Sequence, residues 1–121
     1  SLWPYTRMND PRVKWDDKFI LFKADALPPF KIGYFNPHGW SAYWVDGVLF
    51  RKSFDVHAGL PYPDNNCNAE MYCGERFIEL ESLAPFGKLN PGEEAKHTEV
   101  WEVFEGLDSV SSELRQLLSS I

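Results

Sequence analysis

Asp46-Gly47 stands between two runs of aromatic and β-branched residues, Trp40–Val45 and Val48–Phe54. A two-residue turn of this kind needs positive φ at both central positions, which Asp and Gly tolerate. The flanking runs are rich in the side chains that favour strands. The sequence therefore predicts a β-hairpin here, and a hairpin is stable only when further strands cover its apolar face.

The rest of the chain supplies such strands, because apolar runs alternate with turn residues along its length. We expect further strands at 18–25, 30–35, 69–73, 76–83 and 96–105, with an irregular lead-in at 1–17 and a long loop at 55–68. Asp108 is a plausible N-cap for a short helix over 108–121 with one apolar face. Short strands with turns between them predict an all-β, antiparallel β-sandwich, formed by residues 1–121 as one domain with a C-terminal helix.

Composition narrows the classes of partner. The net charge is −6 and the basic residues are scattered, so nucleic acid is not an expected partner. No apolar run is long enough to span a membrane, and no signal-peptide pattern precedes the domain. Ser1 is not a Met, so a leader or a preceding domain could have been removed. Cys67 and Cys73 are more readily explained as two thiols than as a disulfide, which favours a cytoplasmic location.

Glu79 and Glu81 lie two positions apart in the expected strand at 76–83. Because strand side chains alternate, both carboxylates point to one face while Ile78 and Leu80 point to the other. Two like charges on one face do not help folding. Either that face is solvated, or the acids serve a ligand.

The last strand carries His97, Glu99 and Trp101 on a single face. A hairpin joining residues 83 and 96 would place these three beside Glu79 and Glu81. An aromatic ring beside carboxylates and a histidine suits a sugar, since the ring stacks on the pyranose and the acids bind its hydroxyls. The alternative is a surface strand with one apolar anchor.

The loop at 55–68 and its surroundings hold further hydrogen-bonding groups suited to a sugar: His57, Tyr62, Asp64 and Glu70. Asp and Asn side chains in loops also cap their own turns, so this set has a structural alternative. The histidines, acids and cysteines show no metal-ligand spacing, and no phosphate-binding loop is present. We expect neither a metal nor a cofactor.

The order of these motifs resembles the galactose mutarotase-like (aldose 1-epimerase-like) proteins. The resemblance rests on Leu80-Glu81 followed by Leu89-Asn90-Pro91-Gly92-Glu93, together with Asp10-Pro11-Arg12, Lys31-Ile32-Gly33, Trp40-Ser41-Ala42-Tyr43, Leu49-Phe50-Arg51-Lys52, Tyr62-Pro63-Asp64, Asn68-Ala69-Glu70, Glu79-Leu80-Glu81 and His97-Thr98-Glu99-Val100-Trp101. It implies that Glu81 is a general base that takes the anomeric proton of a sugar. In that family a histidine is the general acid that protonates the ring oxygen of the sugar. In this chain Ile32 stands where the family has that histidine, so the proton would come from Lys31, His57 or His97.

The resemblance also implies a sandwich larger than this chain, which would supply only its C-terminal portion. The chain is then a fragment, a short form completed by another copy, or a small sandwich that binds without catalysing. Open sheet edges favour self-association, so we expect a homodimer or larger assembly. The expected function is binding of a small sugar, with an aldose epimerase (isomerase) activity as an option. Glu81 and His97 are the expected catalytic residues, and Glu79, Glu99, Trp101 and Lys31 join the loop residues in binding. The alternative is a non-catalytic binding or assembly module with no sugar chemistry.

Overall fold

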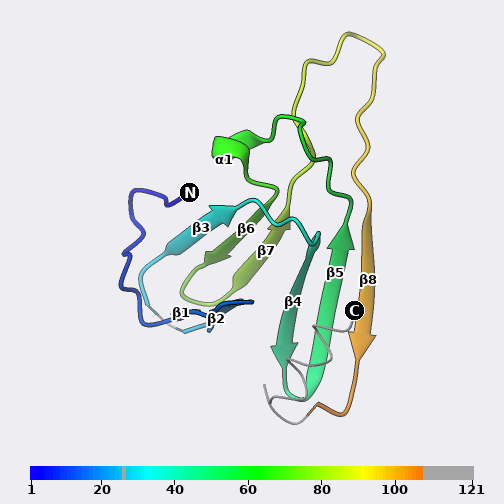
Figure 1. The fold of residues 1–121 in the computed structure, drawn as a ribbon. Helices are drawn as coiled ribbons and strands as arrows, with labels where there is room; N and C mark the ends of the chain where they lie inside the picture. The colour runs from blue at the N-terminus through cyan, green and yellow to red at the C-terminus, as the bar shows by residue number, and fades with distance from the viewer. Residues whose placement is uncertain (26, 108–121) are drawn as a thin grey trace.

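A computed structural model describes residues 1–25 and 27–107 of the chain (Figure 1). Its strands are β1 (Val13–Trp15), β2 (Ile20–Phe22), β3 (Phe30–Tyr34), β4 (Trp40–Val45), β5 (Val48–Phe54), β6 (Ala69–Cys73), β7 (Ile78–Ser82) and β8 (Glu99–Phe104), with one short helical turn, α1 (Pro63–Asn66). The C-terminal helix expected at 108–121 lies outside the described residues. No helix in the described part of the chain is both long and apolar enough to cross a membrane.

The strands form three antiparallel sheets in a sandwich-like arrangement. Their orders are β1-β2, β3-β6-β7 and β4-β5-β8. The β3-β6-β7 sheet stands beside the β4-β5-β8 sheet, and the small β1-β2 sheet lies at one end of the pair (Figure 1). The expected all-β, antiparallel sandwich is therefore confirmed.

The Asp46-Gly47 hairpin forms as expected. Strands β4 and β5 pair from Trp40 opposite Ser53 to Val45 opposite Val48. Asp46 and Gly47 both take positive φ, 49° and 79°, which matches the requirement of a two-residue turn.

Two expectations about the remaining segments are wrong, and the loop at 55–68 contains one short helical turn. The lead-in at 1–17 is not irregular throughout, because it contains β1, which pairs with β2, and Leu2 forms a bridge to Ile32. The loop at 55–68 contains α1, although Asp64 and Asn65 have left-handed backbone angles and make it a turn more than a helix. The hairpin expected between residues 83 and 96 does not form, since β7 pairs with β6 and β8 pairs with β5.

The apolar core sits on one face of the β3-β6-β7 sheet. Phe30, Ile32 and Met71 are buried there, and partly buried side chains from β1, β2 and β7 surround them. The rings of Phe22 and Phe30 lie 5.0 Å apart, which ties the β1-β2 sheet to this core. Because side chains alternate along a strand, the residues between the core positions point to the opposite, outer face of the sheet.

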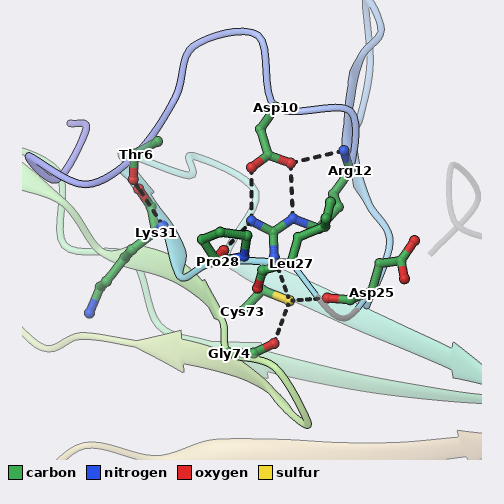
Figure 2. A network of polar contacts seen from close by, with 9 residues as sticks. All are labelled: Thr6, Asp10, Arg12, Asp25, Leu27, Pro28, Lys31, Cys73 and Gly74. Atoms are coloured by element: carbon green, nitrogen blue, oxygen red, sulfur yellow. Dashed lines mark hydrogen bonds and ion pairs between the residues drawn. The ribbon is translucent and has the colours of Figure 1, made fainter.

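A buried arginine fixes the N-terminal segment to this framework (Figure 2). The Arg12 side chain is bidentate on Asp10, with Nε 2.9 Å from Oδ1 and Nη2 2.8 Å from Oδ2. It also donates to the backbone carbonyl of Pro28 at 2.6 Å and to the buried thiol of Cys73 at 3.6 Å. Cys73 and Cys67 are both free and buried, as the sequence favoured.

Candidate functional site

The outer face of the β3-β6-β7 sheet carries a row of charged side chains. Gly33, Glu70 and Glu81 stand opposite one another on three adjacent strands, because Gly33 pairs with Glu70 and Glu70 pairs with Glu81. Lys31 and Glu79 occupy the neighbouring row on the same face, one on each side of Tyr72. The pairing of the three strands thus brings Lys31 and Glu81, which are 50 positions apart in sequence, close together on one face.

Lys31 joins the two acids of this face. Its Nζ lies 2.7 Å from Oε2 of Glu70 and 2.9 Å from Oε1 of Glu81. Only 1% of the Glu70 side chain is exposed, against 16% for Lys31 and 30% for Glu81. The set runs from a buried carboxylate to one that solvent reaches, and we call Lys31, Glu70 and Glu81 the outer cluster.

A glycine and a tryptophan shape the space above the outer cluster. The ring of Trp3 lies over Lys31, with Nζ 4.7 Å from the ring centroid. A Cβ on Gly33 would stand 2.8 Å from Sγ of Cys67 and 3.2 Å from both Trp3 and Glu70. Only glycine at position 33 therefore lets Trp3 and Glu70 approach the sheet this closely.

Backbone pairing holds the segment that carries Trp3. The N–H of Gly33 donates to the carbonyl of Ser1 at 3.0 Å, next to the bridge between Leu2 and Ile32. Thr6 continues this edge, because its Oγ1 donates to the carbonyl of Lys31 at 2.6 Å and accepts from the N–H of Lys31 at 3.0 Å. Residues 1–6 therefore lie along the edge of β3.

Electrostatics at the outer cluster are unusual for a sheet surface. Burial raises the pKa of Glu70, and the nearby carboxyls of Asp64 and Glu81 raise it further, while Lys31 opposes them. Burial alone would lower the pKa of Lys31, but hydrogen bonds to Glu70 and Glu81 outweigh it and hold that pKa well above its usual range. The ammonium of Lys31 thus pairs with two carboxyls, and a third, that of Asp64, lies beside Glu70. Among the described residues, no amide, hydroxyl or ammonium group donates to Oε1 of Glu70, while the carboxyl of Asp64 lies within hydrogen-bond reach of the Glu70 side chain.

A second cluster lies on the other side of β7, around Glu99. Its Oε1 accepts from Nζ of Lys52 at 3.0 Å and from Oγ of Ser82 at 2.5 Å, and its Oε2 accepts from Nε1 of Trp101 at 2.9 Å. Burial opposes ionisation, but these three donors lower the pKa of Glu99 to about 2. Lys52 also donates to the carbonyl of Leu80, which links β5 to β7. We call Glu99, Lys52, Ser82, His97 and Trp101 the inner cluster.

Ser82 and His97 do not form a nucleophile and base within the inner cluster. Ser82 Oγ lies 2.7 Å from Nε2 of His97 and 2.5 Å from Glu99. Since Glu99 is ionised and can only accept, Ser82 donates its proton to Glu99 and accepts from His97. A serine activated for attack would donate to the histidine instead.

A groove of about 500 Å³ opens beside the inner cluster. Four aromatic side chains line it, together with Ile78, Leu80, Lys52 and Glu99: Tyr43, Phe50, Phe77 and Trp101. The rings of Phe50 and Trp101 meet edge to face at 5.6 Å. The groove is therefore mostly apolar, with one internal ion pair.

The structure divides the residues expected in one site. The single face expected for Glu79, Glu81, His97, Glu99 and Trp101 is wrong, because β7 and β8 belong to different sheets. Glu81 meets Lys31 on the outer face of β7, whereas Ser82, the next residue, meets His97 and Glu99 on the inner side. Adjacent side chains of a strand point to opposite faces, so Glu81 and His97 cannot act on one sugar in this arrangement.

The loop residues divide in the same way. Glu70 belongs to the outer cluster, and Asp64 adjoins it. Tyr62 is buried, packs edge to face on Phe35 at 5.7 Å, and accepts a hydrogen bond from the backbone N–H of His57 at 3.0 Å. Tyr62 therefore stabilises the loop, and His57 joins neither cluster.

Sequence reasoning missed Trp3, Lys52 and Ser82. Trp3 lies in the segment expected to be irregular, and only its pairing along β3 brings it to the site. The inward face of β5 carries apolar side chains except at Lys52. A lysine among apolar residues on such a face could have indicated a buried ion pair from the sequence alone. Within residues 1–25 and 27–107, no group of three His, Cys, Asp or Glu side chains is arranged to hold a metal ion.

Comparison with known proteins gave no match to a family model, a curated protein or a solved structure.

Proposed function

We propose that the outer cluster binds a small carbohydrate. The observation that carries the proposal is Glu70 itself: a carboxylate buried to 99%, with Lys31 on one oxygen and no described amide, hydroxyl or ammonium donor on the other. A buried acceptor without a donor is destabilising, and a hydroxyl of a ligand would satisfy it. Folding alone gives no reason to place this group here.

A hydroxyl-rich ligand suits the neighbours of Glu70. A sugar hydroxyl both donates and accepts, so it can donate a hydrogen bond to Oε1 of Glu70 and accept one from the ammonium of Lys31. The Trp3 ring supplies the flat apolar surface on which a pyranose stacks. Glu81 is the most exposed member of the cluster, where it can bind a second hydroxyl. The resemblance to the mutarotase-like proteins points to the same class of ligand.

Ring opening is less well supported than binding. The resemblance makes Glu81 the general base, and the donor nearest to it is Lys31. A lysine whose pKa is raised gives up its proton reluctantly, so it is a poor general acid at neutral pH. Glu70 has the raised carboxyl pKa that suits a base. Binding is therefore the proposed function, and anomer exchange is an activity to be measured beside it.

The test is a titration with galactose, glucose and their relatives, followed by NMR shifts and by Trp fluorescence. We expect shifts at the outer cluster and a fluorescence change that Trp3→Phe removes. Glu70→Gln replaces an acceptor oxygen by an amide and should weaken binding at least about tenfold, the effect of losing one charge-assisted hydrogen bond. Glu99→Gln, in the inner cluster, is the matched control and should bind normally.

Two results would overturn the proposal. The first is that no sugar binds at millimolar concentration, which would favour a module without sugar chemistry. The second is binding that Trp101→Phe and Glu99→Gln abolish while Glu70→Gln leaves it intact, which would move the site to the aromatic groove. Anomer exchange that Glu81→Gln abolishes would add an epimerase activity to the binding site.

A further inference from the structure

Strand β8 is an edge strand of its sheet, and among residues 1–25 and 27–107 its outward backbone groups have no strand to pair with. The backbone N–H of Phe54 donates to the carbonyl of Gly39, so the backbone groups of Phe54 point toward β4. Because these groups alternate in direction along a strand, the even-numbered residues of β5 bond to β4 and the odd-numbered residues bond to β8. Their partners on β8 are Val100, Glu102 and Phe104. The N–H and C=O groups of Glu99, Trp101 and Val103 therefore point away from β5, and no other strand of the described chain pairs with them.

The side chains of β8 are also unusual for a free edge. Val100, Trp101 and Val103 are 58%, 68% and 63% exposed. The strand reads Glu-Val-Trp-Glu-Val-Phe and contains neither Lys nor Pro, the residues that commonly protect an edge from another strand. Exposed apolar side chains beside an unpaired backbone are typical of a strand that pairs with another chain.

Both acids of β8 pair with basic side chains of the neighbouring strand. Glu99 pairs with Lys52 at 3.0 Å, and Glu102 pairs with Arg51 at 3.2 Å. Without these partners the acids would repel an approaching copy of a protein whose net charge is −6. The local ion pairs weaken this repulsion wherever the two copies of an acid are not directly opposite each other, which favours a second copy over a partner that must bring positive charge.

We propose that β8 pairs with β8 of a second copy of this chain, antiparallel, about a two-fold axis at Trp101. Such an axis places two residues opposite each other only when both belong to the same face of the sheet. With the axis at Trp101, Glu99 faces Val103 of the second copy, and Val100 faces Glu102 of the second copy. The result is one six-stranded sheet, β4-β5-β8 continued by its symmetry mate.

One other register that bonds outward backbone groups and overlaps most of β8 has its axis at Glu102. It would place the two copies of Glu102 opposite each other and Glu99 opposite Glu105 of the second copy. Like charges directly opposite are destabilising, so the axis at Trp101 is preferred. Both copies then bury Trp101 at the centre of the interface, where aromatic residues contribute most.

Proline scanning of the two edges tests the interface. Val103→Pro removes an N–H that pairs with no strand in the described part of the chain, so the fold should remain while the dimer weakens about 30-fold, one hydrogen bond being lost in each copy. Ala42→Pro is the matched control on the opposite edge, because the N–H of Ala42 likewise points away from β5. It should leave the dimer unchanged. Masses come from sedimentation equilibrium, and circular dichroism checks each fold; Val103→Lys replaces Val103→Pro if the latter unfolds.

Cysteine cross-linking tests the register. Residues directly opposite in a bonded antiparallel pair have Cα atoms about 5.5 Å apart, within the reach of a disulfide. Oxidised Trp101→Cys should form a covalent dimer, while Val103→Cys should not, and the native thiols are buried. A wild-type chain that stays monomeric at about 100 µM, which corresponds to a binding free energy weaker than about −5.5 kcal/mol, would overturn the proposal. So would a dimer insensitive to position 103, or one broken by Ala42→Pro.

Discussion

Removing the side chain of Arg12 should destabilise the fold more than any surface substitution. Arg12→Met keeps much of the apolar stem but deletes a guanidinium that is 2% exposed and bidentate on Asp10. The carboxylate of Asp10, itself 9% exposed, would be left without its cation, and the carbonyl of Pro28 would lose its donor. The β1-β2 sheet and the segment before β3 depend on these contacts (Figure 2).

The magnitude follows from the burial of both partners. Removing one member of a buried ion pair typically costs about 3–5 kcal/mol, because the other charge stays buried without compensation. The free energy of unfolding of a single domain is about 5–15 kcal/mol, so Arg12→Met removes a large share of it. For a chain of this length the expected fall in the unfolding midpoint is roughly 10–20 °C.

The assay is urea unfolding followed by Trp fluorescence, with thermal unfolding by circular dichroism as the second probe. Lys96→Met is the control, because Lys96 and Glu94 form an exposed pair at 3.6 Å and its removal should have no measurable effect. Adding Asp10→Asn to Arg12→Met should restore part of the loss, since the unpaired charge is then gone. A loss below about 1 kcal/mol in Arg12→Met would refute the reasoning.

Other expectations concern pH, backbone strain and thiols. The pKa of Glu99 is lowered from 4.5 to about 2, so its share of stability is complete above pH 4.5 and is lost as pH falls toward 2. Glu99→Gln should flatten the stability–pH curve in that window, measured by urea unfolding at each pH. Gly39→Ala should cost more than Gly59→Ala, since both have positive φ but only the Cβ at 39 would meet a backbone oxygen, at 2.5 Å; unfolding midpoints compare them. Cys67 and Cys73 are buried and free, so a thiol reagent should label them only at the rate of unfolding, and fast labelling of the native protein would contradict this.

The strands that the sequence predicted best are those fixed by local chemistry. Asp46-Gly47 fixes both the turn and the register of β4 and β5, and the observed bounds of these strands match the expected ones. β6 also matches at both ends, since Asn68 and Gly74 flank its apolar run. β1 was missed because it has only three residues, which is too short for an alternating pattern, and Pro and Asp residues surround it. It forms because β2 pairs with it.

The outer cluster was predictable in part. Alternation correctly placed Glu79 and Glu81 on the same face, and Lys31 and Glu70 were expected to bind a ligand. Their meeting depends on the register of β3, β6 and β7, which joins positions 31, 70 and 81 and cannot be read from one strand alone. The prediction that β8 pairs with β7 was wrong for a related reason. The connection of residues 83–98 is long enough to carry the chain to β5 of the other sheet, as Figure 1 shows.

The residues expected in one site are divided between the outer and the inner cluster, and the two clusters differ in which groups are left to bind a partner. Glu81 and Ser82 are consecutive on β7, yet Glu81 is held by Lys31 of one sheet and Ser82 by Glu99 of the other. The outer cluster has a buried acceptor, Oε1 of Glu70, that meets no amide, hydroxyl or ammonium donor of the described residues, and in the proposed function a sugar hydroxyl would supply that donor. At the inner cluster, both carboxylate oxygens of Glu99 already accept hydrogen bonds, so a sugar that binds Glu99 would have to displace existing bonds. Among the described residues, the outward backbone edge of β8 stays unpaired on that side, beside the exposed ring of Trp101, and the second strand proposed above would cover both.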